Sequence, residues 1–124
     1  MFKVEPVGEK VLIVEGKTDR ERLEQVLREP VSFVCTRGTI GYEELLEIAE
    51  RLEDEDVYVF VDADESGMKL RRQLRRELPR ARHVYTQKMY REVARTPLHV
   101  LAKALANAHF DVDPKWLTEV DHRP

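Results

Sequence analysis

The chain has 124 residues, of which 42% are hydrophobic and 36% charged, with a formal net charge of -3. This size and composition fit one folded domain over residues 1–124 and exclude an intrinsically disordered chain. No apolar run approaches the roughly 20 residues that cross a bilayer, and the first residues lack the apolar stretch of a secretory signal. We therefore expect a cytoplasmic protein with no membrane partner.

Apolar runs alternate with amphipathic stretches, which is the pattern of repeated βα units. The apolar runs predict strands at 10–14, 31–35, 57–61 and 82–85. Helical periodicity predicts helices at 18–28, 42–52, 66–78 and 97–110, with a last short turn at 113–120. Thr18 and Glu21 have the spacing of a capping box for the first helix.

The third apolar run, 57–61, is continuous, as is typical of a central parallel strand buried on both faces. We predict an α/β fold of the Rossmann-like, three-layer kind, with a central four-stranded parallel sheet and helices on both faces. Its core would span about 8–86, followed by a helical extension at about 96–120.

Three carboxylates follow two of the predicted strands. Glu15 comes directly after the first strand, and Asp62 and Asp64 follow the third, with Gly16 and Gly67 close behind them. In an open parallel sheet the carboxyl ends of neighbouring strands meet, so the three acids converge if these strands are neighbours. Gathered carboxylates repel one another unless neutralised, and Mg2+ takes oxygen ligands. The alternative is a surface Glu15 and an Asp64 that serves only as a helix N-terminal anion.

Charge is unevenly distributed along the chain. Residues 1–68 carry 8 Lys/Arg against 18 Asp/Glu, whereas residues 69–95 carry 10 against 2. In the predicted helix 66–78, like-charged arginines lie four apart, which costs helix stability unless an anion is near. That anion is either nucleic-acid phosphate or the glutamate-rich second helix. In the following loop, basic and aromatic residues interleave, which suits either stacking on unpaired bases or ordinary surface packing: Tyr85, Lys88, Tyr90, Arg91 and Arg95.

Two segments resemble the Toprim domain: Glu15-Gly16-Lys17-Thr18-Asp19 after one strand and Asp62-Ala63-Asp64-Glu65-Ser66-Gly67 after another. The resemblance spans residues 8 to about 86. The short chain, the basic residues after Gly67 and the turn Cys35-Thr36-Arg37-Gly38-Thr39 look most like small stand-alone Toprim proteins of bacteria. Those proteins are related to the catalytic domain of the ribonuclease that matures 5S ribosomal RNA.

The resemblance implies roles for the matched residues. Glu15 would be a general acid/base or a metal ligand, and Asp62 and Asp64 would hold Mg2+, with Mn2+ as a substitute. Asp19 matches an acidic position of the first motif, although it also suits an early-helix anion. Ser66 stands where many Toprim proteins have another acid, so a second metal ion is left open.

We therefore expect Mg2+-dependent phosphoryl transfer on nucleic acid, of the nuclease type, with RNA and DNA both open. Supporting positions are Gly16, Asp19 and Gly67, and the candidates for nucleic-acid contact are Lys17, Arg37, Arg71, Arg72 and Arg75. The alternative is a non-catalytic nucleic-acid-binding module of a recombination, repair or RNA-processing complex. A chain this small would then act as a homodimer or with a protein partner.

Overall fold

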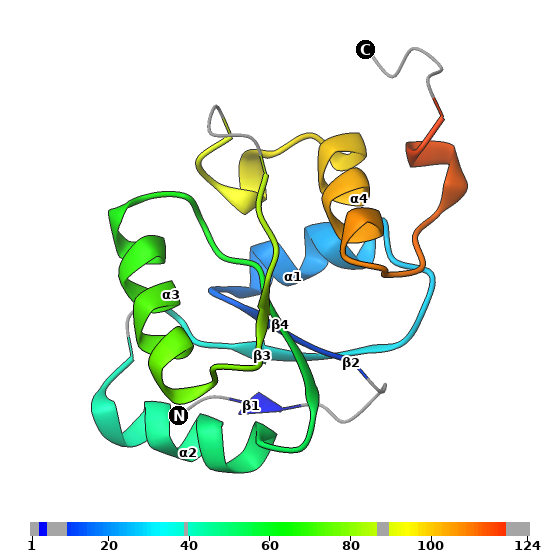
Figure 1. Ribbon diagram of the computed structural model, residues 1–124. Helices are drawn as coiled ribbons and strands as arrows, with labels where there is room; N and C mark the ends of the chain where they lie inside the picture. The colour runs from blue at the N-terminus through cyan, green and yellow to red at the C-terminus, as the bar shows by residue number, and fades with distance from the viewer. Residues whose placement is uncertain (1–2, 5–9, 39, 87–89, 119–124) are drawn as a thin grey trace.

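The computed structural model describes residues 3–4, 10–38, 40–86 and 90–118, which form a sheet with helices on both faces (Figure 1). The strands are β1 (Lys3–Val4), β2 (Lys10–Val14), β3 (Val31–Cys35), β4 (Asp56–Val59) and β5 (Arg82–His83). The helices are α1 (Lys17–Glu24), α2 (Tyr42–Leu52), α3 (Glu65–Glu77) and α4 (Leu98–Asn107). Two single 3-10 turns complete these elements, η1 (Val93–Arg95) and η2 (Pro114–Trp116).

The strand order is β1-β3-β2-β4-β5, and β2, β3, β4 and β5 run parallel. The prediction of a four-stranded parallel sheet is thus confirmed, and β2 and β4 are neighbours, with Ile13 opposite Val59. Strand β1 adds an antiparallel edge on β3 that the sequence did not reveal. Strands β4 and β5 end earlier than predicted, because beyond them the strand pairing continues only as isolated hydrogen bonds. One of these is donated by the Phe60 amide to the Ile13 carbonyl at 2.9 Å.

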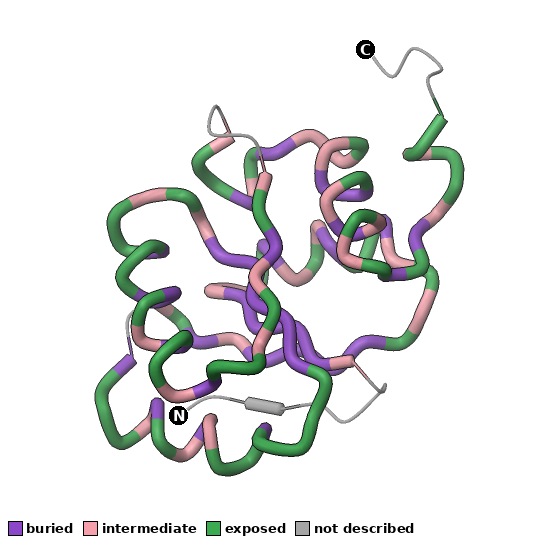
Figure 2. Tube along the Cα trace, in the orientation of Figure 1, coloured by how far each residue is buried: buried purple, intermediate pink, exposed green. Residues whose placement is uncertain are grey.

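Alternate residues of the central strand face two separate cores. Leu12 and Val14 pack in a core with residues of α1, η1 and α4, whereas Val11 and Ile13 pack in a core with residues of α2 and α3. This alternation follows from the period of two along a strand. Figure 2 shows the buried residues concentrated on the central strands and on the inner sides of the helices. The chain thus forms three layers, with the sheet between two sets of helices. The ends of the strands are not covered by these helix layers and can contribute side chains to a site.

Helix α1 differs from its prediction at both ends. It begins at Lys17 with Gly16 as its N-cap, and the Gly16 amide donates to Asp19 Oδ2 at 3.1 Å, so the predicted capping box of Thr18 and Glu21 is wrong. It ends at Glu24 rather than at residue 28. Residues 26–28 instead form an antiparallel bridge with residues 111–113, so tertiary pairing overrides the helical pattern there.

The C-terminal extension packs on the same face as α1. Helix α4 is shorter than the predicted 97–110, since Pro97 is its N-cap and His109, with φ of 70°, turns the chain away. Turn η2 lies within the predicted 113–120, of which residues 119–120 are outside the described part. None of the helices in the described residues is long and apolar enough to cross a membrane.

Candidate metal and phosphoryl-transfer site

The three strand-end carboxylates come together. Glu15 follows β2, Asp62 and Asp64 lie between β4 and α3, and one oxygen from each can be chosen so that all lie within 4.8 Å of one another. All three residues are partly buried. The parallel pairing of β2 with β4 produces this convergence, because it places the carboxyl ends of the two strands at one sheet edge.

Each carboxylate is held by one backbone amide. The Asp62 amide donates to Glu15 Oε1 at 2.8 Å, the Val93 amide to Asp62 Oδ1 at 2.8 Å, and the Gly67 amide to Asp64 Oδ1 at 2.7 Å. Among the described residues, no hydrogen bond engages the second oxygen of these three side chains. Each acid is therefore oriented by one oxygen and can offer the other to a cation.

Gly67 is required by close packing. A Cβ built on it would lie 1.9 Å from the Asp62 carbonyl oxygen, a distance that no side chain can adopt. Because Gly67 has no Cβ, the first turn of α3 can approach the strand end, and the Gly67 amide reaches Asp64. Gly16 differs, because a Cβ there would meet its nearest neighbour, Asp19 Oδ2, at 3.9 Å, which is ordinary contact. The structure gives Gly67 a clear positioning role and gives Gly16 no comparable steric one.

The surroundings of the site disfavour the ionised forms of Glu15 and Asp62. Burial raises the pKa of Glu15 from 4.5 to about 7, helped by the charges of Asp62, Asp64 and Asp19 and opposed by the hydrogen bond from the Asp62 amide. Burial also raises the pKa of Asp62, with further contributions from Asp64 and Glu92. Crowded carboxylates of this kind favour either a proton or a cation.

Asp19 is both a helix anion and a member of the acidic group. It is 8% exposed and accepts from the Gly16 amide, yet burial and the charge of Asp62 raise its pKa to about 6. Glu92 is an acidic neighbour that the sequence did not reveal, and its charge acts on both Asp19 and Asp62. Its position depends on a long-range contact, in which the Arg91 carbonyl accepts from the Ala63 amide at 2.6 Å, and no local spacing signals that contact.

Arg71 is not where the sequence led us to expect it. The side chain predicted to contact phosphate is 1% exposed. Its guanidinium donates to the Val61 carbonyl at 3.2 Å, to the Val84 carbonyl at 2.8 Å and to His83 Nδ1 at 3.0 Å. Arg71 is therefore an internal cation that joins α3 to the strand ends, and its positive charge acts on Glu15. The prediction failed because an arginine next to the apolar face of a helix gives the same sequence pattern whether its side chain is buried or exposed.

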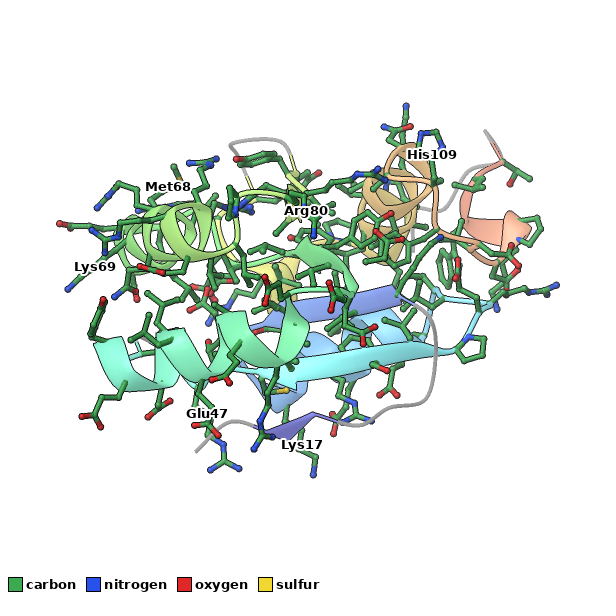
Figure 3. The ribbon with its side chains drawn as sticks, turned by 60° about the horizontal axis from the view of Figure 1, so that its bottom comes forward. Lys17, Glu47, Met68, Lys69, Arg80 and His109 are labelled. Atoms are coloured by element: carbon green, nitrogen blue, oxygen red, sulfur yellow. The ribbon has the colours of Figure 1, made fainter. Side chains whose placement is uncertain are left out.

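The other basic candidates are exposed. Arg72 and Arg75 lie on the outer side of α3, and Arg75 donates to the Tyr85 hydroxyl. Arg37 is exposed in the left-handed conformation, with φ of 60°, while its amide donates to the Glu15 carbonyl at 2.6 Å. The Lys17 side chain is 88% exposed, and its Nζ lies 3.9 Å from Glu21 Oε1. Figure 3 shows Lys17 at the outer surface of the molecule.

The alternative explanation for the α3 arginines was pairing with the glutamates of α2. Among the described residues, no ion pair joins an arginine of α3 to a glutamate of α2. Arg76 instead approaches Glu77 of its own helix at 3.9 Å, and Arg51 of α2 pairs with Glu47 at 3.1 Å. The positive surface of α3 is therefore not neutralised by α2.

The donor set fits a hard divalent cation. Three partly buried carboxylates converge, each with one oxygen fixed and one available. The raised pKa values of Glu15 and Asp62 indicate that negative charge is unfavourable at these two positions. Oxygen-only ligands of this kind suit Mg2+ or Mn2+ rather than softer metals. The chain is thus an α/β domain with a candidate divalent-metal site at the carboxyl edge of its parallel sheet.

Comparison with known proteins identifies the family to which the chain belongs. The model of the Toprim domain matches residues 10–94, and the chain belongs to this family. It is 52% identical over 109 residues to the uncharacterized protein YusF of Bacillus subtilis (strain 168), covering 88% of this chain and 75% of that protein. A solved small TOPRIM domain protein from Bacillus stearothermophilus superposes with a TM-score of 0.87 at 49% identity, covering 94% of this chain and 98% of that one.

More distant relatives are ribonucleases. Ribonuclease M5 of Mycoplasma pneumoniae (strain ATCC 29342 / M129 / Subtype 1) is 35% identical over 69 residues, which are 55% of this chain and 38% of that protein. Ribonuclease M5 1 of Ligilactobacillus salivarius (strain UCC118) is 34% identical over 79 residues, covering 63% and 42%. The matched segments thus span about two fifths of these ribonucleases.

Proposed function

We propose that this protein is a divalent-metal-dependent enzyme of phosphoryl transfer on nucleic acid, which cleaves strands of RNA or DNA. The observation that carries the proposal is the convergence of Glu15, Asp62 and Asp64, each fixed through one oxygen and available through the other. Structural acids at a sheet edge do not need this arrangement, whereas ligands of a cation do.

In this proposal Asp62 and Asp64 are the main ligands of Mg2+ or Mn2+. A bound cation would supply charge neutralisation on the scissile phosphate and activation of water. Glu15 acts as a further ligand or as a proton donor and acceptor, and its pKa of about 7 suits proton exchange at neutral pH. Lys17, Arg37, Arg72 and Arg75 are exposed and contact flanking phosphates, while Arg71 acts as a positioning residue.

The relatives support the nuclease interpretation. Two matched proteins are named ribonuclease M5, and the strand-end acids lie within the Toprim segment 10–94. Because this chain spans only about two fifths of those ribonucleases, their substrate is not carried over. A cytoplasmic location, as expected from the sequence, belongs to the same proposal.

A second candidate function rests on the exposed basic side chains of α3, Arg72 and Arg75, which can hold nucleic acid without a metal ion. In this case the chain is a binding module that uses the same fold without catalysis, as a homodimer or with a protein partner. Binding of nucleic acid that is not followed by cleavage with any divalent metal would favour this candidate.

The test is cleavage of a panel of structured RNA, single-stranded DNA and duplex DNA with Mg2+, with Mn2+ and with chelator. The key variants are Glu15→Gln and Asp62→Asn, because each amide keeps an oxygen to accept its backbone hydrogen bond. Asp54→Asn, at an exposed carboxylate before β4, is the matched control. We expect cutting that needs metal, persists in the control and is lost in both site variants. Cleavage that survives both substitutions contradicts the proposal.

A further inference from the structure

A groove runs along the outer side of β5 and α4. Two adjoining cavities form it, of about 660 Å³ and about 350 Å³, and both are lined by Tyr85, Ala104 and Asn107. Figure 1 shows the segment after β5 rising beside α4. In the described residues β5 has no strand on its far side, so this is the open edge of the sheet. The size is that of a ligand site.

The lining of the groove has the opposite charge to the acidic site. Its ionisable side chains, among the described residues, are Arg82, Lys103, the tyrosines and three histidines, and no carboxylate lines it. Elsewhere, the cavity between α2 and α3 is lined by four glutamates. His83 does not add charge at neutral pH, because burial and the charges of Arg71 and Arg75 lower its pKa to about 4. Arg82 and Lys103, which are exposed, supply positive charge for an anion.

Tyr85 lies between the two cavities and is unusually well held for an exposed aromatic residue. It is 50% exposed, yet the Arg71 guanidinium lies 4.1 Å from its ring centroid and Arg75 donates to its hydroxyl. The His83 ring is nearly parallel to it at 6.3 Å. An exposed aromatic ring in a fixed orientation is a platform on which an unpaired base can stack.

Two contacts join the lining of the groove to the strand end that carries the acidic site. Arg71, which contacts Tyr85, also donates to the carbonyl of Val61, the residue before Asp62. In the second cavity, Tyr90 lines the groove and is followed by Arg91, whose carbonyl accepts from the amide of Ala63. The groove lining is thus connected on both sides to the segment that carries Asp62 and Asp64.

We infer that this groove binds an unpaired stretch of the nucleic-acid strand next to the scissile phosphate. Tyr85 stacks on a base, and Arg82 and Lys103 contact the backbone phosphates. The inference rests on the proposed function and deepens it, since it makes single-stranded nucleic acid, or an unpaired end or loop, the substrate class. A duplex fits less well, because its bases are already stacked on one another and cannot face Tyr85.

The test is binding measured by fluorescence anisotropy in chelator, where no metal-dependent cutting can occur. The probes are labelled oligouridylate and oligothymidylate of about 12 nucleotides, a length on the order of one such site, and a duplex of equal length. We expect the single strands to bind more tightly than the duplex. Tyr85→Ala should weaken single-strand binding about tenfold, and Tyr85→Phe should bind within about twofold of the wild type. The two probes also distinguish RNA from DNA.

The charge contribution is measured with Lys103→Gln. If Lys103 binds one phosphate, the slope of log affinity against log salt concentration should become shallower by about 0.7 in this variant. Tyr42→Ala and Arg51→Gln, at exposed positions of α2 on the other face of the sheet, are the matched controls and should change nothing. If Tyr85→Ala fails to fold, Lys103→Gln and the duplex comparison decide. Equal affinity for the duplex, or single-strand binding unchanged in both Tyr85→Ala and Lys103→Gln, overturns the inference.

The two proposals fail separately. Groove variants that raise KM and leave kcat unchanged, beside an Asp62→Asn protein that binds but does not cut, support both. If the wild type cuts nucleic acid and the groove variants have no effect, the nuclease proposal stands and the inference about the groove is wrong. If binding depends on the groove but no divalent metal supports cutting, the inference about the groove stands and the binding module becomes the favoured function.

Discussion

Gly67 and Asp62 are in backbone contact, so close that a Cβ on the glycine would stand 1.9 Å from the aspartate carbonyl oxygen. This contact sets the distance between the first turn of α3 and the end of β4. The same glycine donates its amide to Asp64, so one position controls the placement of both aspartates.

Substitution Gly67→Ala should therefore displace the helix and both aspartates. We expect a loss of about 2 kcal/mol or more in the free energy of unfolding, as for other overpacked sites, together with weaker metal binding. Urea unfolding and metal titration measure the two effects. Gly41→Ala is the control, since a Cβ on Gly41 meets nothing within 4 Å, and it should cost less than about 1 kcal/mol. Equal losses in the two variants would show that the contact does not constrain the site.

The raised pKa of Glu15 predicts a pH-dependent stability. Between pH 4.5 and about 7 the unfolded chain loses this proton while the folded protein keeps it, so the metal-free protein becomes less stable as pH rises through that window. Glu15→Gln removes this component and keeps the acceptor for the Asp62 amide. We expect the variant to gain about 1–2 kcal/mol over the wild type between pH 5 and pH 8, after allowance for solvent screening. Urea denaturation in chelator at both pH values measures it, and a constant difference would contradict the pKa shift.

Metal binding should relieve the same repulsion. Because Glu15, Asp62 and Asp19 are deprotonated at higher pH than isolated carboxyls, Mg2+ affinity should rise from about pH 5 to pH 8, with release of protons. Calorimetry in two buffers of different ionisation enthalpy detects these protons. Millimolar Mg2+ should also raise the melting temperature of the wild type but not that of Asp62→Asn. A variant stabilised as much as the wild type would place the cation elsewhere.

Arg71 and Arg72 are adjacent in α3 but differ in burial, and that difference predicts their sensitivity. Arg71→Met leaves the Val61 and Val84 carbonyls without their donor and should cost roughly 3 kcal/mol. Arg72→Met changes an exposed side chain and should cost less than about 0.5 kcal/mol. Loss of the Arg71 charge should also raise the pKa of His83 above about 4, although burial still keeps it below 6.5, and an NMR titration of the imidazole follows this. Similar stability of the two variants would refute the assignment of Arg71 as an internal cation.

The sequence predicted the parallel sheet and the meeting of Glu15 with Asp62 and Asp64, because continuous apolar strands and strand-end acids are local signals. The sequence could not predict the features that depend on contacts between residues far apart in the chain. Residues 26–28 carry a helical pattern but pair with residues 111–113, and Glu92 reaches the site only through the contact of Arg91 with Ala63. The burial of Arg71 was equally hidden, since helical periodicity gives a face but not which polar neighbour of that face lies inside.

The carboxylates of Glu15, Asp62 and Asp64 are tied to amides from three different parts of the chain, at residues 62, 93 and 67. A group of acids built in this way is ordered without a cation, so under the proposed function coordination would fix few torsions that are not already fixed. Selection among divalent ions would then depend on the coordination number and hydration of each ion and on its concentration.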